Sequence, residues 1–208
     1  SQVAFISVDA AGHRNIFWHR GSAYPEIPET LPALFAEPTR ILHLDGLHLD
    51  TAVTAAEMAR KSNLLTVLDA GTWRPGIEKL LPLIDHLVVA EKFARQVIGR
   101  DEPEAALVEL SRYGADAVTV TLGRAGSVTM TGEEVIHQEA FNVNTVDTTG
   151  CGDVFHGGYI YGLLQNWSLD KTLRFASACA ALKTRALGGR TAIPYLCEVE
   201  ELLESVEV

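Results

Sequence analysis

Residues 147 to 155 read Asp-Thr-Thr-Gly-Cys-Gly-Asp-Val-Phe and lead from a polar turn into a long apolar stretch. This pattern predicts a helix over residues 151–165, opened by Gly150 and Gly152. A glycine turn at a helix start exposes backbone N–H groups at the positive helix end, where anions bind. Asp153 falls in the first turn, beside these donors. A carboxylate there can take the proton of an attacking hydroxyl while the N–H groups stabilise a transferring phosphoryl group.

Two other interpretations of this turn remain at this point. Spacing alone explains Asp153 equally well as an acidic residue that complements the helix dipole. Cys151 invites a thiol-nucleophile interpretation, but no His–Asn/Asp context accompanies it, so we reject that role.

Upstream of the turn, short β-prone segments alternate with helical ones. This alternation predicts parallel βαβ units and therefore an α/β fold with a mostly parallel, doubly wound sheet flanked by helices. We expect strands at residues 41–44, 64–68, 87–89 and 117–121, and helices at 51–61, 77–81, 91–98 and 102–113. An antiparallel hairpin at 127–130 and 134–137 and helices at 170–186 and 195–205 complete the prediction.

The N-terminal part has a different pattern. Residues 3–8 and 14–18 predict a β-hairpin, and a connection with four prolines follows. We therefore divide the chain into a hairpin over residues 1–24 and one α/β nucleotide-binding domain over residues 25–208. Because Ser1 opens almost directly on a strand, we expect a preceding segment.

Composition excludes several classes of partner. The 208 residues carry a formal net charge of −10, which argues against non-specific binding to nucleic acid or anionic membranes. No apolar run reaches membrane-spanning length, and three scattered cysteines without C-x-x-C spacing favour a reducing compartment. We therefore expect a cytoplasmic protein.

The nine residues at 147–155 resemble the C-terminal signature of the ribokinase (PfkB-type) carbohydrate kinases, D-T-x-G-A-G-D-x-F, with Cys151 replacing alanine. The resemblance implies a ribokinase-like fold and ATP-dependent phosphorylation of a sugar hydroxyl. It implies that Asp153 is the catalytic base and that Gly150, Cys151 and Gly152 form the anion hole. It also places a monovalent cation, K⁺, near Asp147 and Thr149.

Further segments resemble the nucleotide site of this family. Thr121-Leu-Gly-Arg-Ala-Gly126 is similar to its T-L-G-x-x-G segment, which implies nucleotide contacts from Thr121, Gly123 and Gly126. Residues 175–182 and the loop with Gly189 resemble the helix and loop that wall the adenine and complete the cation site. Ser177 stands there where many relatives carry asparagine.

One segment resembles the region that helps to place Mg²⁺. Residues 87–91 are similar to the family's N-x-x-E region, which implies an indirect Mg²⁺ role for Glu91, although Ala90 replaces the usual asparagine. The N-terminal hairpin resembles strands of the small β lid. The N-terminal third of the family pattern, with much of that lid, is missing from the chain.

Candidate substrate residues follow the predicted strands, where open α/β sheets bind ligands. Asp45 and Gly46 follow the first of these strands, and Asp69 and Trp73 follow the next, although a turn role is slightly favoured for each. His43 and His48 suggest a metal pair, but no third ligand accompanies them.

Three classes of function can be compared: a phosphotransferase, a nicotinamide dehydrogenase and a non-catalytic relative. Within the first class, a sugar kinase, of fructose type or acting on a sugar derivative, is favoured over a nucleoside kinase of the same fold. A dehydrogenase predicts an early G-x-G-x-x-G and a P-loop kinase predicts G-x-x-x-x-G-K-[ST], and both strings are absent. A non-catalytic nucleotide- or sugar-binding relative is the third class. By analogy with the family, we expect a homodimer that binds ATP and a sugar.

Overall fold

The structure is a computed structural model that describes residues 3–8, 14–19, 21–22, 31 and 39–206. The chain divides into two compact units, residues 1–37 and 38–208. In the first unit, β1 (Val3–Val8) pairs antiparallel with β2 (Arg14–His19), which confirms the predicted hairpin. The predicted boundary between residues 24 and 25 and most of the proline-containing connection lie outside the described residues.

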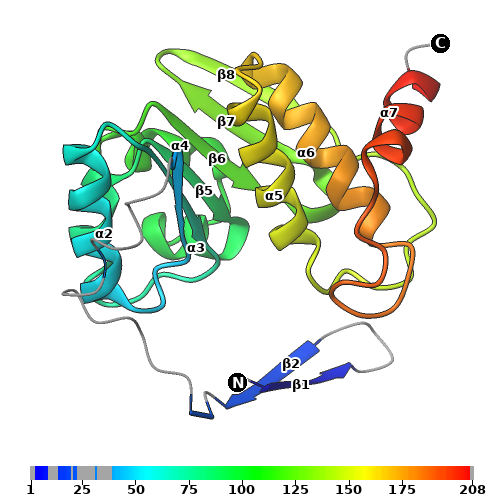
Figure 1. Cartoon of the computed structure of the whole chain (residues 1–208), viewed down its shortest axis with the longest axis horizontal. Coiled ribbons are helices and arrows are strands. Elements are labelled where there is room, and N and C mark those ends of the chain that lie inside the picture. Colours follow the sequence, from blue (N-terminus) through cyan, green and yellow to red (C-terminus); the bar gives the residue numbers. More distant parts are fainter. Residues whose placement is uncertain (1–2, 9–13, 20, 23–30, 32–38, 207–208) are drawn as a thin grey trace. The chain divides into compact units, whose positions relative to one another are not determined.

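The second unit is built on a six-stranded sheet whose strands follow one another in chain order (Figure 1). Its strands are β3 (Ile41–Leu44), β4 (Leu65–Ala70), β5 (His86–Ala90), β6 (Ala117–Thr121), β7 (Ser127–Thr131) and β8 (Glu134–Gln138). The first four are parallel and the last two pair antiparallel. The predicted mostly parallel sheet is therefore confirmed. The parallel strands are rich in Val, Leu and Ile, as strands buried on both faces require.

Helices cover both faces of this sheet. The bounds are α2 (Leu49–Lys61), α3 (Glu91–Ile98), α4 (Pro103–Ser111), α5 (Cys151–Leu164), α6 (Leu169–Lys183) and α7 (Leu196–Ser205). The described residues also form the short 3₁₀ helices η2 (Ile77–Lys79), η3 (Leu81–Leu83) and η4 (Gly123–Ala125). No helix in the described part of the chain is long and apolar enough to cross a membrane.

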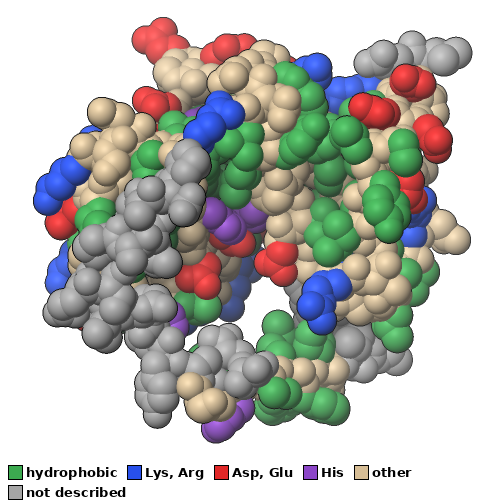
Figure 2. Space-filling model, in the orientation of Figure 1, with side chains coloured by type: hydrophobic (Ala, Val, Ile, Leu, Met, Phe, Trp, Pro, Cys, Tyr) green, Lys and Arg blue, Asp and Glu red, His purple; other side chains and the backbone are tan. Residues whose placement is uncertain are grey.

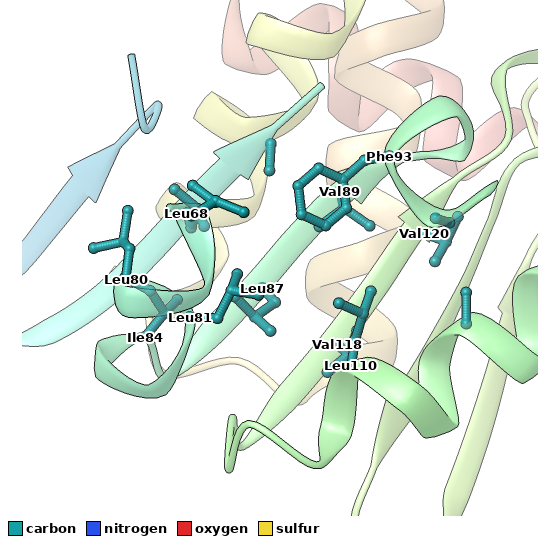
Figure 3. Packing of buried hydrophobic residues seen from close by; sticks show 14 of the residues in the cluster. Leu68, Leu80, Leu81, Ile84, Leu87, Val89, Phe93, Leu110, Val118 and Val120 are labelled. Atoms are coloured by element: carbon teal, nitrogen blue, oxygen red, sulfur yellow. The ribbon is translucent and has the colours of Figure 1, made fainter. Parts of the chain in front are cut away.

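One face of the sheet is packed by the elements that connect its parallel strands. Figure 3 shows Leu68, Leu87 and Val118 on this face, near Leu80 and Phe93 from η2 to α3. Successive residues of a strand point to opposite faces, so the residues next to these three along their own strands face the other side of the sheet.

The other face is covered by α5 and α6. Val67 and Val88 pack there against Phe155, Tyr159 and Leu173. The two helices approach closely, since a Cβ on Gly158 would lie 2.9 Å from Ala176 Cα. Asp69 of β4, two residues after Val67, therefore faces α5.

Several predicted bounds differ from the structure. The strand predicted at 64–68 runs to Ala70, so Asp69 belongs to β4 and does not follow it. The helix predicted at 77–81 is instead the pair of short 3₁₀ helices η2 and η3, which are separated by Leu80, and Pro82 lies inside η3. The helix predicted at 170–186 ends at Lys183, because the next N–H groups bond to carbonyls three residues back. The helix η4 was not predicted.

Candidate functional site

The candidate site lies where the parallel strands end. The carboxyl ends of β3 to β6 meet at one edge of the sheet because these strands are parallel. Asp45 and Gly46 follow β3, Asp69 lies near the end of β4, and Glu91 begins α3 directly after β5. Leu47 N–H donates to Asp45 Oδ1 (3.0 Å), which holds this carboxylate in a turn.

The start of α5 lies at the same site. Gly150 has φ 78°, and the helix receives no side-chain cap. A Cβ on Gly150 would lie 2.7 Å from Gly189 O, so glycine permits both the turn and the close approach of the second loop. Cys151 N–H donates to Thr148 O (3.2 Å), whereas the Gly152 and Asp153 N–H groups have no backbone partner among the described residues.

The exposed face of the first turns of α5 carries almost no side chain. Gly152 and Gly157 have ordinary helical φ, and a Cβ on either would meet no atom within 4 Å. Neither backbone conformation nor packing therefore requires glycine here, although glycine costs a helix about 1 kcal/mol relative to alanine. The exposed Asp153 stands between them on this face. The arrangement leaves room for a ligand against the helix backbone.

Asp153 also lines a cavity of about 250 Å³ with residues from the sheet edge. The cavity is lined by Asp45, Leu47, Asp69, Ala70, Gly71, Thr72, Arg74, Ile77 and Asp153. Three carboxylates, which accept hydrogen bonds from hydroxyl groups, thus converge with one arginine. Histidine and acidic side chains gather in the middle of the face drawn in Figure 2.

A second hollow, of about 450 Å³, lies elsewhere on the α/β unit. It is lined by Gln138, Trp167, Asp170, Lys171, Arg174, Phe175, Glu200 and Leu203. None of these residues belongs to the start of α5 or to the carboxyl ends of the parallel strands. We therefore place the site at the smaller cavity, which Asp153 lines.

Behind the cavity, His156 connects α5 to the sheet. Its Nδ1 lies 2.8 Å from Gly152 O and 3.3 Å from Asp69 Oδ2, and its Nε2 lies 3.3 Å from Val88 O. A carbonyl oxygen only accepts, so a ring nitrogen that bonds to Gly152 O or to Val88 O carries its hydrogen. The carboxylate of Asp69 approaches the same ring nitrogen as Gly152 O. The side chain of His156 is 6% exposed, so this pair is held largely away from water.

The neighbouring charges affect one another. Burial raises the pKa of Asp69, while His156 opposes that rise and Asp153 adds to it. His43 stacks on the His156 ring, with centroids 5.8 Å apart. Burial, with His156 second, lowers the pKa of His43. His43, His156, Asp69 and Asp153 therefore form one electrostatic group.

The segment before α5 is tied to the loop after α6. Asp147 Oδ1 accepts from Thr149 N–H (2.9 Å), and Asp147 Oδ2 accepts from Gly188 N–H (2.7 Å). These bonds, that of Thr149 first, lower the pKa of Asp147 to about 2. Lys183 Nζ donates to Asp147 O (3.1 Å).

The predicted nucleotide residues lie on two sides of one segment. Gly126, after η4, has φ 92°, and a Cβ there would collide with Gln138 O. Ser177 of α6 is buried, and its hydroxyl donates to Glu139 O (3.3 Å). Residues 138–140 thus touch both Gly126 and α6. Thr121 ends β6, where its hydroxyl lies 3.4 Å from Val89 O, and Gly123 begins η4.

The structure does not bring every candidate together. Glu91 is exposed at the start of α3 and shares only the sheet edge with Asp153. His43 lies in β3 and His48 precedes α2, and no group of three or more possible ligands that could hold a metal occurs among the residues described. Sequence reasoning missed the roles of His156, Arg74 and Lys183. A signal was available for His156, since it lies four residues after Gly152 and so on the same helix face.

Comparison with known proteins shows which family the chain resembles. The family described as pfkB family carbohydrate kinase matches residues 1–195. The chain is 27% identical over 205 residues to the ATP-dependent 6-phosphofructokinase of Thermoanaerobacterium thermosaccharolyticum, covering 91% of this chain and 63% of that protein. It is 31% identical over 223 residues to the fructokinase of Klebsiella pneumoniae, covering 95% of this chain and 72% of that protein.

A solved structure agrees with these relatives. The ribokinase of Arabidopsis thaliana, complexed with ribose and ATP, superimposes with a TM-score of 0.83 at 27% identity. The match covers 97% of this chain and 68% of that one. The chain thus spans roughly two thirds of the length of these relatives, 63% of the phosphofructokinase.

Proposed function

Because this chain belongs to the pfkB family of carbohydrate kinases, we propose that it carries the nucleotide-binding and catalytic part of an ATP-dependent sugar kinase. The supporting observation is the position of Asp153, which lines the acidic cavity from the uncapped start of α5. One carboxylate is thereby next to both a pocket for an acceptor and a site for phosphate.

In the proposed reaction, Asp153 removes the proton of an acceptor hydroxyl as its oxygen attacks the γ-phosphorus of ATP. A new O–P bond forms, the bond from the γ-phosphorus to the bridging oxygen breaks, and ADP leaves. The glycine turn at residues 150–152 supplies the anion hole, and the N–H groups of Gly152 and Asp153 are the donors with no backbone partner.

The acceptor is proposed to be a sugar. Asp45 and Asp69 offer only acceptor oxygens, which match the O–H donors of a polyhydroxy compound. None of the described residues that line the cavity is aromatic, whereas a nucleobase is commonly held by stacking on aromatic rings. This chemistry favours a sugar over a nucleoside.

Two cofactors belong to the proposal. ATP would lie between the start of α5 and the residues Thr121, Gly123, Gly126, Ser177 and Gly189. Mg²⁺ neutralises phosphate charge when it is bound with ATP. Glu91 fits an indirect role in holding it, since its exposed carboxylate lies at the same sheet edge. A cytoplasmic location and a homodimer remain predictions.

The monovalent cation expected at Asp147 and Thr149 does not fit the residues present. Lys183 already directs a buried ammonium group at Asp147 O. No step of the proposed reaction therefore depends on K⁺.

A coupled ADP-release assay with Mg²⁺ tests the proposal, with ketoses, ribose and nucleosides as acceptors. ATP binding is measured in parallel by calorimetry. Sugar-dependent ADP release is the expected result. ATP binding without turnover on any acceptor would favour the non-catalytic alternative, and a chain that binds no ATP would eliminate the proposal.

A further inference from the structure

Lys183 is a charged residue in an unusual place. It lies in the last turn of α6 and has 0% exposed surface. An ammonium group is strongly disfavoured away from water unless it is paired and hydrogen-bonded. Its hydrogen bond goes to Asp147 O (3.1 Å), a backbone carbonyl of the segment that leads into α5. The chain therefore keeps a positive charge at a buried site, where the cost of removing that charge from water must be offset by other interactions.

The surroundings of this ammonium group are built from two loops. Val146 and Asp147 N–H both donate to Thr184 O, at 2.8 and 3.0 Å. Gly188 N–H donates to Asp147 Oδ2 (2.7 Å), and Gly189 O closely approaches Gly150. The charge on Lys183 also helps to keep the pKa of Asp147 low, after the hydrogen bonds from Thr149 and Gly188. Lys183 thus belongs to the junction of the two loops on which α5 begins.

The family resemblance assigns a monovalent cation to the same two segments, the one that leads into α5 and the loop that follows α6. We propose that the Lys183 ammonium group takes the place of that cation in this chain, so that nucleotide binding and folding do not depend on K⁺. The proposal rests on the proposed function in one respect, because the junction matters only if α5 binds phosphate.

Electrostatic repulsion disfavours a monovalent cation bound next to the ammonium group of Lys183. Two unit positive charges about 4 Å apart, in the dielectric of a protein surface, repel enough to weaken cation binding on the order of a thousandfold. Lys183 also competes for the lone pairs of Asp147 O. A lysine ammonium, unlike a bound ion, is attached to the helix and always present. Lys183 is accordingly a positioning residue, which acts through the Asp147 segment.

The first test uses the unaltered chain. Thermal unfolding is recorded in KCl, NaCl and choline chloride at one ionic strength, and ²⁰⁵Tl NMR reports whether Tl⁺, a K⁺ analogue, binds. We expect the same unfolding midpoint in the three salts, within about 1 °C, and no bound Tl⁺. A saturable, K⁺-specific rise of the midpoint together with bound Tl⁺ would overturn the proposal.

The second test separates the charge from the space that it fills. Lys183→Ala opens room at the junction, and we expect its ATP affinity to fall about tenfold in choline and to recover in KCl. Lys183→Met fills the room without charge, so its ATP affinity should be equally weak in both salts. Lys171→Ala, at an exposed position of the same helix, is the matched control and should behave as the unaltered chain.

The outcomes also separate this inference from the proposed function. A Lys183→Ala variant that folds and shows no K⁺-specific response would overturn the inference. Should that variant not fold, the salt comparison on the unaltered chain decides. Failure of the unaltered chain to bind ATP would instead remove the proposed function, while the Tl⁺ measurement would still report on Lys183.

Discussion

At the scale of single residues, Asp153 carries the proposed chemistry. Asp153→Asn keeps the shape of the side chain and removes its basicity. We expect turnover to fall about 10²- to 10⁴-fold while the ATP dissociation constant stays within about threefold. The measurements are steady-state ADP release and calorimetric ATP binding.

Asp170→Asn is the matched control for this variant. Asp170 is an exposed aspartate in the first turn of α6, as Asp153 is in the first turn of α5, but it lies away from the cavity. Equal loss in both variants, or full activity of Asp153→Asn, would remove Asp153 as the base.

His156 and Asp69 form a pair that a double-mutant cycle can measure. Replacing either partner leaves the other group largely buried without this contact. For Asp69→Asn, His156→Gln and the double variant, we expect a coupling free energy of about 1–3 kcal/mol in chemical unfolding. Additive effects of the two substitutions would show that the 3.3 Å contact contributes no coupling.

At the scale of elements, the start of α5 is predicted to bind phosphate through a surface without side chains. Gly152→Val puts a branched side chain on that surface, where its Cβ has open space. We expect unchanged or slightly raised stability without ligand, because valine is a better helix former than glycine. ATP should lose most of its stabilisation, which is about 2.7 kcal/mol at a hundred times the dissociation constant. Unfolding with and without ATP checks both parts, and an intact ATP effect would place the anion hole elsewhere.

Because α5 packs closely against α6, we expect alanine substitutions at two adjacent glycines of α5 to change stability in opposite directions. A Cβ on Gly158 would lie 2.9 Å from the backbone of Ala176, whereas a Cβ on Gly157 would meet open space. We expect Gly158→Ala to destabilise the fold by about 1–3 kcal/mol through overpacking. Gly157→Ala should stabilise it by about 0.5–1 kcal/mol. Urea unfolding of both variants decides, and the same sign for both would contradict the packing of the two helices.

At the scale of the whole molecule, two histidines link folding to pH. Burial lowers the pKa of His43 and of His86 below the ordinary value of 6.5. As the pH falls below about 6.5, these histidines take up protons more readily in the unfolded chain than in the folded chain. Their contribution to the free energy of unfolding is therefore fully present above about pH 6.5 and is lost as the pH falls below it. Asp69, whose pKa burial raises above 3.8, acts in the opposite sense, since its contribution to stability is present below that value and is lost as the pH rises above it.

His86→Asn tests this linkage. His86 Nδ1 lies 2.9 Å from the hydroxyl of the buried Tyr159, so its environment belongs to the core under α5. We expect the loss of unfolding free energy between pH 7.5 and pH 5.5 to shrink by several tenths of a kcal/mol or more. His137→Asn, at an exposed site, is the control. An equal change in the control would assign the pH dependence to surface charge.

The sequence predicted most elements of this molecule because their signals are local. The bounds of β3, β6 and α3 agree with the predictions, and α5 differs by one residue. The predictions failed where tertiary contacts override local pattern. Asp69 continues β4 because that strand is paired with β5 as far as Ala70. At the end of α6, Thr184 O accepts from the N–H groups of Val146 and Asp147, which belong to the segment before α5, and not from a further turn of its own helix.

The candidate site shows the same division. Asp153 and the glycine turn could be found from nine adjacent residues, since a helix start and its first turn form one local motif. The pairing of His156 with Asp69 could not be found in this way. It requires a helix late in the chain to cover one face of an early strand.

By itself, then, the sequence determined the α/β class, the order of its elements and the turn that opens α5, because periodicity and glycine act over a few residues. The tertiary structure alone decided which side chains meet at that turn. Lys183 reaches Asp147 across 36 residues of chain, and no local pattern encodes this contact. It exists because α5 and α6 pack closely enough, at Gly158 and Gly162, to bring the end of one helix to the segment that precedes the other.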